Sequence, residues 1–268
     1  MFDLNNKFVL ITGSAGLLGP KHVEVILEYN GIPIITDINK EKLNKLDIEL
    51  KYKYPKKEYY IEYLDITNSE NIKILLDKYN IDILINNAAQ NPIVTDTGLS
   101  SKINRFEDMN FQNWLTGCNV SINGTFLITQ AVVKQMIEKK VKGVILNIAS
   151  DLAVIAPDQR IYKKENESFL NQDVKPIYYS VVKHALIGFT KYLSTYLAPY
   201  NIRVNSLSPS GIYNNHPDDF VKKISNLIPL KRMANINEYK GAVIFSISEA
   251  SSYMTGNNLI IDGGRTIW

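Results

Sequence analysis

The chain has 268 residues, 45% of them hydrophobic, with 30 basic and 27 acidic residues and a net charge of +3. This length suits one large α/β domain or two small ones, and the dispersed, nearly balanced charge argues against a nucleic-acid or membrane partner. One cysteine, Cys118, excludes an internal disulfide, and with three scattered histidines we expect no metal site.

Seven short apolar runs have strand character: residues 8–12, 33–36, 59–64, 81–85, 144–148, 204–207 and 259–261. Helical patterns lie between them at 18–29, 40–53, 69–79, 107–139, 178–198 and 236–248. Nearly all-apolar runs are typical of strands buried on both faces of a parallel sheet. The alternation predicts a Rossmann-type doubly wound α/β fold of about seven strands, with helices on both faces, as a single domain over residues 1–268.

A glycine-rich loop follows the first predicted strand and opens the first predicted helix. Glycines there allow the backbone to approach a pyrophosphate, whose charge then meets the free N–H groups of the helix start. A plain strand–helix turn is the alternative, and the place of the loop in the first βαβ unit disfavours it. We expect cofactor contacts from Gly13, Ala15, Gly16, Leu17 and Leu18.

Asp37 ends the second predicted strand, 24 residues after Gly13. An acidic side chain at this place can accept hydrogen bonds from the adenosine ribose and repels the 2′-phosphate of NADP. This favours NAD over NADP, although Lys40 and Lys42 lie nearby. Alternatively, Asp37 only caps the helix that begins near Asn39.

Polar and small residues end the next two predicted strands. Asp65 and Ile66 follow the third strand, and Asn87 and Ala88 follow the fourth. Ligands of an open α/β sheet bind beyond the carboxyl ends of its strands. We therefore expect these four residues to line the cofactor site, although each alone is more often part of a turn.

Tyr179 and Lys183 stand at positions i and i+4, on one face of the predicted helix 178–198. Interconversion of an alcohol and a carbonyl moves a hydride to or from a nicotinamide and a proton to or from the oxygen. The pKa of free tyrosine is about 10, and a neighbouring ammonium and the positive nicotinamide both favour phenolate. The pair therefore predicts general acid/base chemistry; the alternative for Tyr179 is an ordinary packed aromatic residue.

These motifs together resemble the classical short-chain dehydrogenase/reductase (SDR) family, over nearly the whole chain. The resemblance rests on the glycine loop, Asp65, residues 86–89, Ser150, residues 179–183, residues 201–205, Pro209, residues 255–256 and residues 262–264. The stretch from Val204 and the final residues also resemble a bacterial subgroup associated with flagellin modification and surface-sugar synthesis.

The resemblance assigns roles to particular residues. It implies that Ser150 hydrogen-bonds the reacting oxygen, that Tyr179 is the general acid/base and that Lys183 also holds the nicotinamide ribose. It implies that Asn86 lines the cofactor site and that two helices pack across a two-fold axis, giving a homodimer or homotetramer. The further cofactor contacts that it implies are Pro209, Gly211 and Ile212.

The sequence departs from the family pattern at four places. Leu17 occupies the middle glycine, so the glycine spacing is that of sugar-nucleotide epimerases and dehydratases. Alignment of Trp114, Gly124 and Phe126 with the family places Ser121 where the family has an asparagine that holds a proton-relay water. Asn119 and Asn123 flank Ser121, but they lie about 200° away around the helix, so we expect them to face elsewhere. Ser210 interrupts the usual Pro-Gly pair.

The fourth departure is length, since 29 positions separate Ser150 from Tyr179. The polar segments 91–106 and 156–177 leave adjacent strands, so we expect both to border the active site. Their charged residues include Arg105, Arg160, Lys163, Lys164 and Lys175. These favour a hydroxyl-rich or anionic substrate; a solvated surface excursion is the alternative.

The sequence thus predicts an NAD(H)-dependent oxidoreductase acting on a small, polar, sugar-like substrate. Two alternatives stay open: a sugar-nucleotide epimerase or dehydratase with bound NAD, and a catalytically silent nucleotide-sensing binding protein. The chain starts without a signal-peptide pattern and has no apolar run near the ~18 residues that cross a membrane. We therefore expect a cytoplasmic location.

Overall fold

The computed structural model describes residues 1–90, 104–164 and 167–268. Within these residues seven strands form one sheet of order β3-β2-β1-β4-β5-β6-β7, and all neighbours pair in parallel. The strands are β1 (Phe8–Ile11), β2 (Ile32–Asp37), β3 (Tyr60–Tyr63), β4 (Ile83–Asn86), β5 (Val144–Ile148), β6 (Arg203–Pro209) and β7 (Asn258–Ile261). The order reverses between β1 and β4, which confirms the doubly wound prediction and places a ligand crevice at that point.

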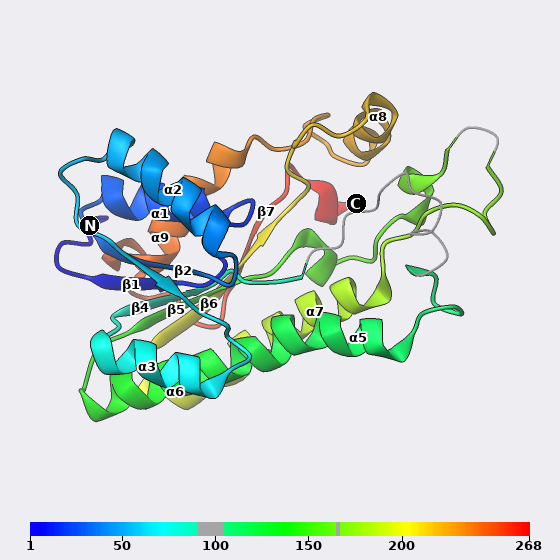
Figure 1. The fold of residues 1–268 in the computed structure, drawn as a ribbon. Coiled ribbons are helices and arrows are strands. Elements are labelled where there is room, and N and C mark those ends of the chain that lie inside the picture. The colour runs from blue at the N-terminus through cyan, green and yellow to red at the C-terminus, as the bar shows by residue number, and fades with distance from the viewer. Residues whose placement is uncertain (91–103, 165–166) are drawn as a thin grey trace.

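Helices cover both faces of the sheet (Figure 1). Helices α1, α2 and α9 lie on one face, and α3, α5, α6 and α7 lie on the other. Their bounds are α1 (Gly19–Glu28), α2 (Lys40–Lys53), α3 (Ser69–Lys78), α5 (Phe111–Cys118), α6 (Thr125–Glu138), α7 (Ile177–Leu197), α8 (Asp218–Asn226) and α9 (Lys240–Ile247). None of the helices in the described part of the chain is both long and apolar enough to span a membrane.

Two apolar cores lie between the sheet and its helices. In β1, Val9 and Ile11 join the core beneath α1, α2 and α9, whereas Leu10 joins the core beneath α3 and α6. Successive side chains of a strand point to opposite faces, so a sheet covered on both sides needs apolar residues at every position. This is why the strands were recognisable as unbroken apolar runs.

Two features of the helices differ from the sequence prediction. The predicted helix 107–139 is divided by a π-helical turn, Asn119–Gly124, between α5 and α6. Helix α8 was not predicted, although its nine residues have a strongly amphipathic pattern and begin with Asp218 and Asp219. Ile224 anchors this helix in a small core with nearby Met233 and with Ile161, which is distant in sequence.

Gln135 joins α6 to the segment between α3 and β4. Its Oε1 accepts a hydrogen bond from the Ile81 N–H at 2.9 Å, and its Nε2 donates to the carbonyl oxygens of Leu76 and Tyr79, both at 2.9 Å. The side chain is 8% exposed. One amide thus satisfies three backbone groups beneath the sheet.

We expect Gln135→Leu to lower the free energy of unfolding by about 2–4 kcal/mol, because it leaves these backbone groups without their partner. Chemical denaturation measures the change. Gln130→Leu is the matched control, since Gln130 is exposed on the same helix. Equal losses in the two variants would contradict the assigned role.

Candidate active site

The glycine loop packs tightly against the end of β4. Gly13 has φ +64°, and a Cβ there would lie 2.7 Å from the Ala88 Cα. A Cβ on Gly19 would lie 2.2 Å from the Ser14 carbonyl oxygen. A Cβ on Gly16 would approach only the Gly13 carbonyl oxygen, at 3.2 Å. Two glycines are therefore required by packing, while the loop backbone at Gly16 stays accessible to a ligand.

The loop after β4 is bonded directly to the glycine loop. Asn87 Nδ2 donates to the carbonyl oxygens of Thr12 and Gly13, at 3.1 and 2.8 Å. Thr12 Oγ1 accepts from the backbone N–H groups of Asn87 and Ala88, at 3.1 and 3.0 Å. The structure thus brings these predicted cofactor residues together. Burial lowers the pKa of nearby His22 to about 4, so this histidine is neutral beside Asn87.

Asp37 lies at the same crevice. Its Oδ2 accepts from the Ala15 N–H at 3.0 Å, and its Oδ1 accepts from the Asn39 N–H at 2.9 Å. The cap of α2 is Asn39, whose own side chain accepts from the Lys42 N–H. The alternative that Asp37 caps this helix is therefore wrong. Lys40 Nζ lies 4.9 Å from the centre of the Tyr63 ring.

The remaining predicted cofactor residues differ in their exposure and in their hydrogen bonds. Leu17 is 44% exposed, whereas Leu18 and Ile66 are buried, so the latter two can meet a ligand only at their edges or backbones. Asp65 Oδ1 accepts from the Thr67 N–H and hydroxyl, at 2.9 and 2.7 Å. Asp65 therefore shapes the turn after β3.

Ser150, Tyr179 and Lys183 converge where β5 ends. The Lys183 ammonium donates to the Ile148 carbonyl oxygen at 2.7 Å and lies 5.8 Å from the centre of the Tyr179 ring. The helical spacing placed this pair on one face, as predicted. Burial raises the pKa of Tyr179 to about 12; a hydrogen bond with Ser150 lowers it, and the charge of Asp151 raises it. The phenol is therefore protonated at neutral pH in this state.

A second ammonium lies against the same ring. Lys175 Nζ is 4.1 Å from the centre of the Tyr179 ring. Burial lowers the pKa of Lys175 to about 8, partly offset by the charge of Asp151. Burial and the nearby Lys175 charge lower the pKa of Lys183 to about 8. The sequence gave Lys175 no role beyond its place in a charged segment.

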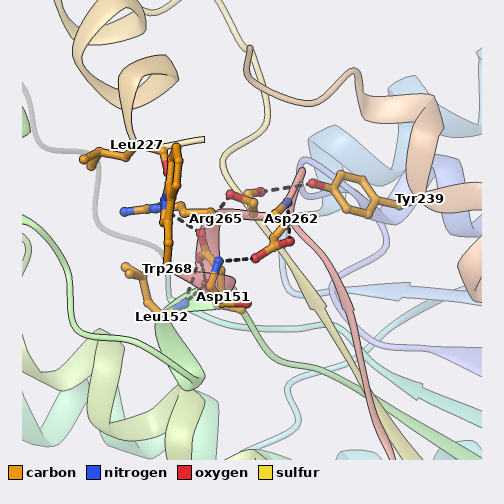
Figure 2. A network of polar contacts seen from close by, with 11 residues as sticks. Asp151, Leu152, Leu227, Tyr239, Asp262, Arg265 and Trp268 are labelled. Carbon is orange, nitrogen blue, oxygen red and sulfur yellow. Dashed lines mark hydrogen bonds and ion pairs between the residues drawn. The ribbon is translucent and has the colours of Figure 1, made fainter. Parts of the chain in front are cut away.

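The buried side chain of Asp151, labelled in Figure 2, belongs to the residue that follows Ser150 in the chain. Asp151 Oδ1 accepts from the Ser150 hydroxyl at 2.9 Å and from the Leu152 N–H at 2.8 Å. Its Oδ2 accepts from the Ser210 hydroxyl at 2.8 Å and from Arg265 Nη1 at 2.7 Å. Asp151 and Arg265 are 3% and 6% exposed, so this ion pair is buried. The buried carboxylate also gives a structural reason for the serine at position 210, because the Ser210 hydroxyl donates a hydrogen bond to it.

The C-terminal segment is fixed around this pair, as Figure 2 shows. Asp262 accepts from the backbone N–H groups of Gly264 and Thr266, at 2.8 and 2.7 Å. Trp268 Nε1 donates to the Leu227 carbonyl oxygen at 3.2 Å, just after α8. These contacts hold Arg265 in place at the active site.

The segment after β6 borders the same site. Pro209 is the last residue of β6. The Gly211 carbonyl oxygen accepts a hydrogen bond from the Ala234 N–H at 3.0 Å. Ile212 forms an isolated parallel bridge with Ala234. A Cβ on Gly211 would lie 2.9 Å from Ile224 Cδ1, so this glycine lets α8 pack closely.

Ser121 lies in the π-helical turn and is 1% exposed. Its Oγ accepts from the Gln90 N–H at 3.4 Å. Asn119 and Asn123 are exposed and hydrogen-bonded to each other, at 3.2 Å. The prediction that these two asparagines face elsewhere is confirmed. Asn86, predicted to line the site, instead donates to Thr129 and Asn147 within the buried layer.

The two long polar segments meet at a cavity. Its volume is about 330 Å³, and its walls include Arg105 from one segment and Gln159 and Lys175 from the other. Residues 91–103 and 165–166 of the predicted segments lie outside the described residues. Three predicted charges are absent from the described wall of this cavity, namely Arg160, Lys163 and Lys164. The described residues contain no group of three or more His, Cys, Asp or Glu side chains that could hold a metal ion.

Comparisons with known proteins agree with this architecture. A family model described as "Enoyl-(Acyl carrier protein) reductase" matches residues 27–266. The chain is 31% identical to post-translational flagellin modification protein A of Campylobacter coli, over 97% of this chain and 98% of that protein. It is 29% identical to an NAD-dependent glycerol dehydrogenase of Listeria innocua, over 99% of this chain and 96% of that protein.

A solved structure is similar along almost the whole chain. It is a short-chain dehydrogenase from Leptospira borgpetersenii with bound NAD⁺, with a TM-score of 0.83, 35% identity, and coverage of 98% of this chain and 94% of that one. The chain belongs to the short-chain dehydrogenase/reductase family. It is therefore a dehydrogenase or reductase of the kind that uses a nicotinamide cofactor.

Sequence reasoning missed Asp151 and Arg265 as parts of the site. Both stood next to recognised motifs, after Ser150 and after the Asp262–Gly264 turn. Nothing in the local pattern joined residues 114 positions apart. The available signal was Ser210, which interrupts the usual Pro-Gly pair.

We expect Arg265→Met to lower the free energy of unfolding by about 3–5 kcal/mol, because it leaves the Asp151 carboxylate buried without its cation. Chemical denaturation measures this loss. Arg232→Met is the control, because it breaks the exposed pair with Glu238 at 2.7 Å. If Arg265→Met were no more harmful than the control, Arg265 would not stabilise the buried carboxylate.

Proposed function

We propose that the chain is an NAD(H)-dependent oxidoreductase that interconverts an alcohol and a carbonyl on a polar, sugar-like substrate. The observation that carries this proposal is the convergence of Ser150, Tyr179 and Lys183 at the end of β5, on the same edge of the parallel sheet as the glycine loop that follows β1. We further propose that the whole chain is one domain working in the cytoplasm.

The glycine loop and its surroundings fit a dinucleotide. Gly13 and Gly19 sit where a Cβ would collide, and Gly16 leaves the backbone open at the start of α1. That is the arrangement through which a helix start receives a pyrophosphate. A bound nicotinamide would supply or accept the hydride.

In this proposal Tyr179 is the residue that transfers the proton. With its pKa raised to about 12, the phenol is an acid that can donate its proton to a carbonyl oxygen during reduction. Nearby positive charge favours the phenolate required for oxidation. Ser150 would hold the reacting oxygen, and Lys183 would hold the nicotinamide ribose while keeping a positive charge near the phenol.

Asp37 supports NAD rather than NADP. Its carboxylate lies at the end of β2 and is already oriented by the Ala15 N–H. This negative charge would accept bonds from the ribose hydroxyls and repel a 2′-phosphate.

The glycine spacing favours the second reading, a sugar-nucleotide epimerase or dehydratase that retains its NAD. The similarity to a glycerol dehydrogenase along nearly both whole chains favours net dehydrogenation instead. Measuring net conversion of added NAD to NADH with polyol and sugar substrates separates these two readings.

A self-association surface accompanies this proposal. Helices α5, α6 and α7 carry exposed apolar side chains, including Leu115, Phe126 and Tyr192. A groove of about 490 Å³ runs between α6 and α7 beside Phe126 and Tyr192. We infer that this face meets a second copy in a homodimer or homotetramer.

We expect Tyr179→Phe to reduce turnover by at least about 100-fold, because general acid–base catalysis contributes that much or more. NADH binding should stay nearly unchanged, since the ring and Lys183 remain. Turnover is followed by nicotinamide absorbance and binding by fluorescence titration. Full activity in this variant would exclude the mechanism.

We expect Asp37→Ala to reduce the preference for NAD over NADP by about 10- to 100-fold, since it removes a charged hydrogen-bond acceptor and a repulsive charge. The ratio of kcat/KM for the two cofactors measures it. Asp47→Ala is the control, because Asp47 bonds Lys51 and Tyr59 on the same side of the sheet. An unchanged ratio would remove Asp37 from the ribose site.

A further inference from the structure

The cavity between the two polar segments adjoins the proton-transfer tyrosine. Lys175 lines this cavity, and its ammonium lies 4.1 Å from the centre of the Tyr179 ring. Ser180, the next residue along α7, also lines the cavity. A ligand in the cavity would therefore lie one side chain away from the group that exchanges the proton.

The position of Lys175 is set by the folding of the insert upon itself. Gln159 Oε1 accepts from the Lys175 N–H at 2.9 Å, and Gln172 Nε2 donates to the Gln159 carbonyl oxygen at 2.9 Å. Arg105 Nη1 donates to the Phe169 carbonyl oxygen at 2.9 Å, which ties the other segment to the insert. The residues added between Ser150 and Tyr179 thus deliver an amine to the active site.

The charges around this place are unusual. The ammoniums of Lys175 and Lys183 lie 4.1 and 5.8 Å from the centre of one tyrosine ring. Each repels the other, and clusters of buried like charges mark sites that bind opposite charge. Glu107 also lines the cavity, but it is bonded to Arg105 at 2.7 Å, so that pair adds no net charge.

The cavity wall also holds hydrogen-bonding groups. Ser180 Oγ is buried and has no hydrogen-bond partner among the described residues. Lys175 contributes an ammonium, whereas the Gln159 amide is already hydrogen-bonded to the Lys175 backbone at both its Nε2 and its Oε1. Carboxylates and phosphates accept several hydrogen bonds at once, and bonds from a charged donor are the strongest of these. The donors and the charge therefore suit an oxyanion better than a neutral hydroxyl.

We propose that this cavity is a subsite for a negatively charged group, a carboxylate or a phosphate, on the substrate whose neighbouring alcohol or carbonyl reaches Tyr179. The proposal rests on the proposed function and narrows its substrate class to acidic sugar derivatives. Lys175 is the residue that selects this class.

The ionisation of Lys175 gives the subsite a pH dependence. The pKa of Lys175 is lowered to about 8, so the amine is charged below pH 8 and loses its charge above it. The titratable or charged groups around it are Asp151 with its partner Arg265, Tyr179, Lys183, and the Arg105–Glu107 pair on the cavity wall. Anion binding should therefore be present at pH 7 and weaken as the pH rises through about 8 to 9.

The test measures binding rather than turnover, with the full-length protein saturated with NADH. The probes are tartrate, its neutral four-carbon counterpart threitol, and inorganic phosphate, each titrated by calorimetry at pH 7. We expect tartrate to bind at least about 10-fold more tightly than threitol, which is the effect of one charged hydrogen bond. Phosphate binding without tartrate binding would indicate a phosphorylated rather than a carboxylic substrate.

The variants assign the charge to one side chain. Lys175→Gln should weaken tartrate or phosphate binding about 10- to 100-fold, whereas Lys175→Arg should keep it. Lys163→Gln is the matched control, because Lys163 belongs to the same insert and is exposed. If Lys175→Gln does not fold, Lys175→Arg decides: arginine stays charged, so its anion binding should persist at pH 9.5, where native binding is lost.

Equal binding of tartrate and threitol together with no phosphate binding, or native anion binding in Lys175→Gln, would overturn the subsite. These outcomes are distinct from failure of the proposed function. Turnover of neutral polyols with no preference for acids would refute the subsite and leave the oxidoreductase. Lys175-dependent anion binding without any turnover would support the subsite and refute the oxidoreductase.

Discussion

The active site depends on one buried carboxylate. Asp151 accepts hydrogen bonds from the ends of β5 and β6 and from the C-terminal segment, through Ser150, Ser210 and Arg265. A carboxylate taken out of water is costly unless every oxygen is bonded and a cation lies beside it. Because Arg265 supplies that cation, the end of the chain packs against the carboxylate that accepts the hydrogen bond from Ser150.

The same carboxylate contributes to the electrostatics around Tyr179. Burial is the main cause that raises the pKa of the phenol, and the charge of Asp151 raises it further; the same charge partly offsets the lowering of the pKa of Lys175 by burial. The ammoniums of Lys175 and Lys183 lie near the Tyr179 ring. Burial and Asp151 therefore favour the protonated phenol, and the two ammoniums leave a positive region beside it.

The departures from the family pattern form a consistent set. Ser210 and Arg265 are both partners of Asp151, and the insert before Tyr179 brings Lys175 to the ring. Ser121 lies in a π-helical turn, and its hydroxyl accepts a hydrogen bond from the backbone N–H of Gln90. We interpret these residues as a variant active site on an ordinary family scaffold.

The sequence by itself determined the sheet, the glycine loop and the pairing of Tyr179 with Lys183. These features depend on local spacing: unbroken apolar runs for strands covered on both faces, and four residues for one helix face. The packing of helix α8 against Ile161, the Asp151–Arg265 pair and the place of Lys175 were decided only by the tertiary structure. Each depends on groups distant in the chain, because burial and the charge of a neighbour exist only after the segments have packed together.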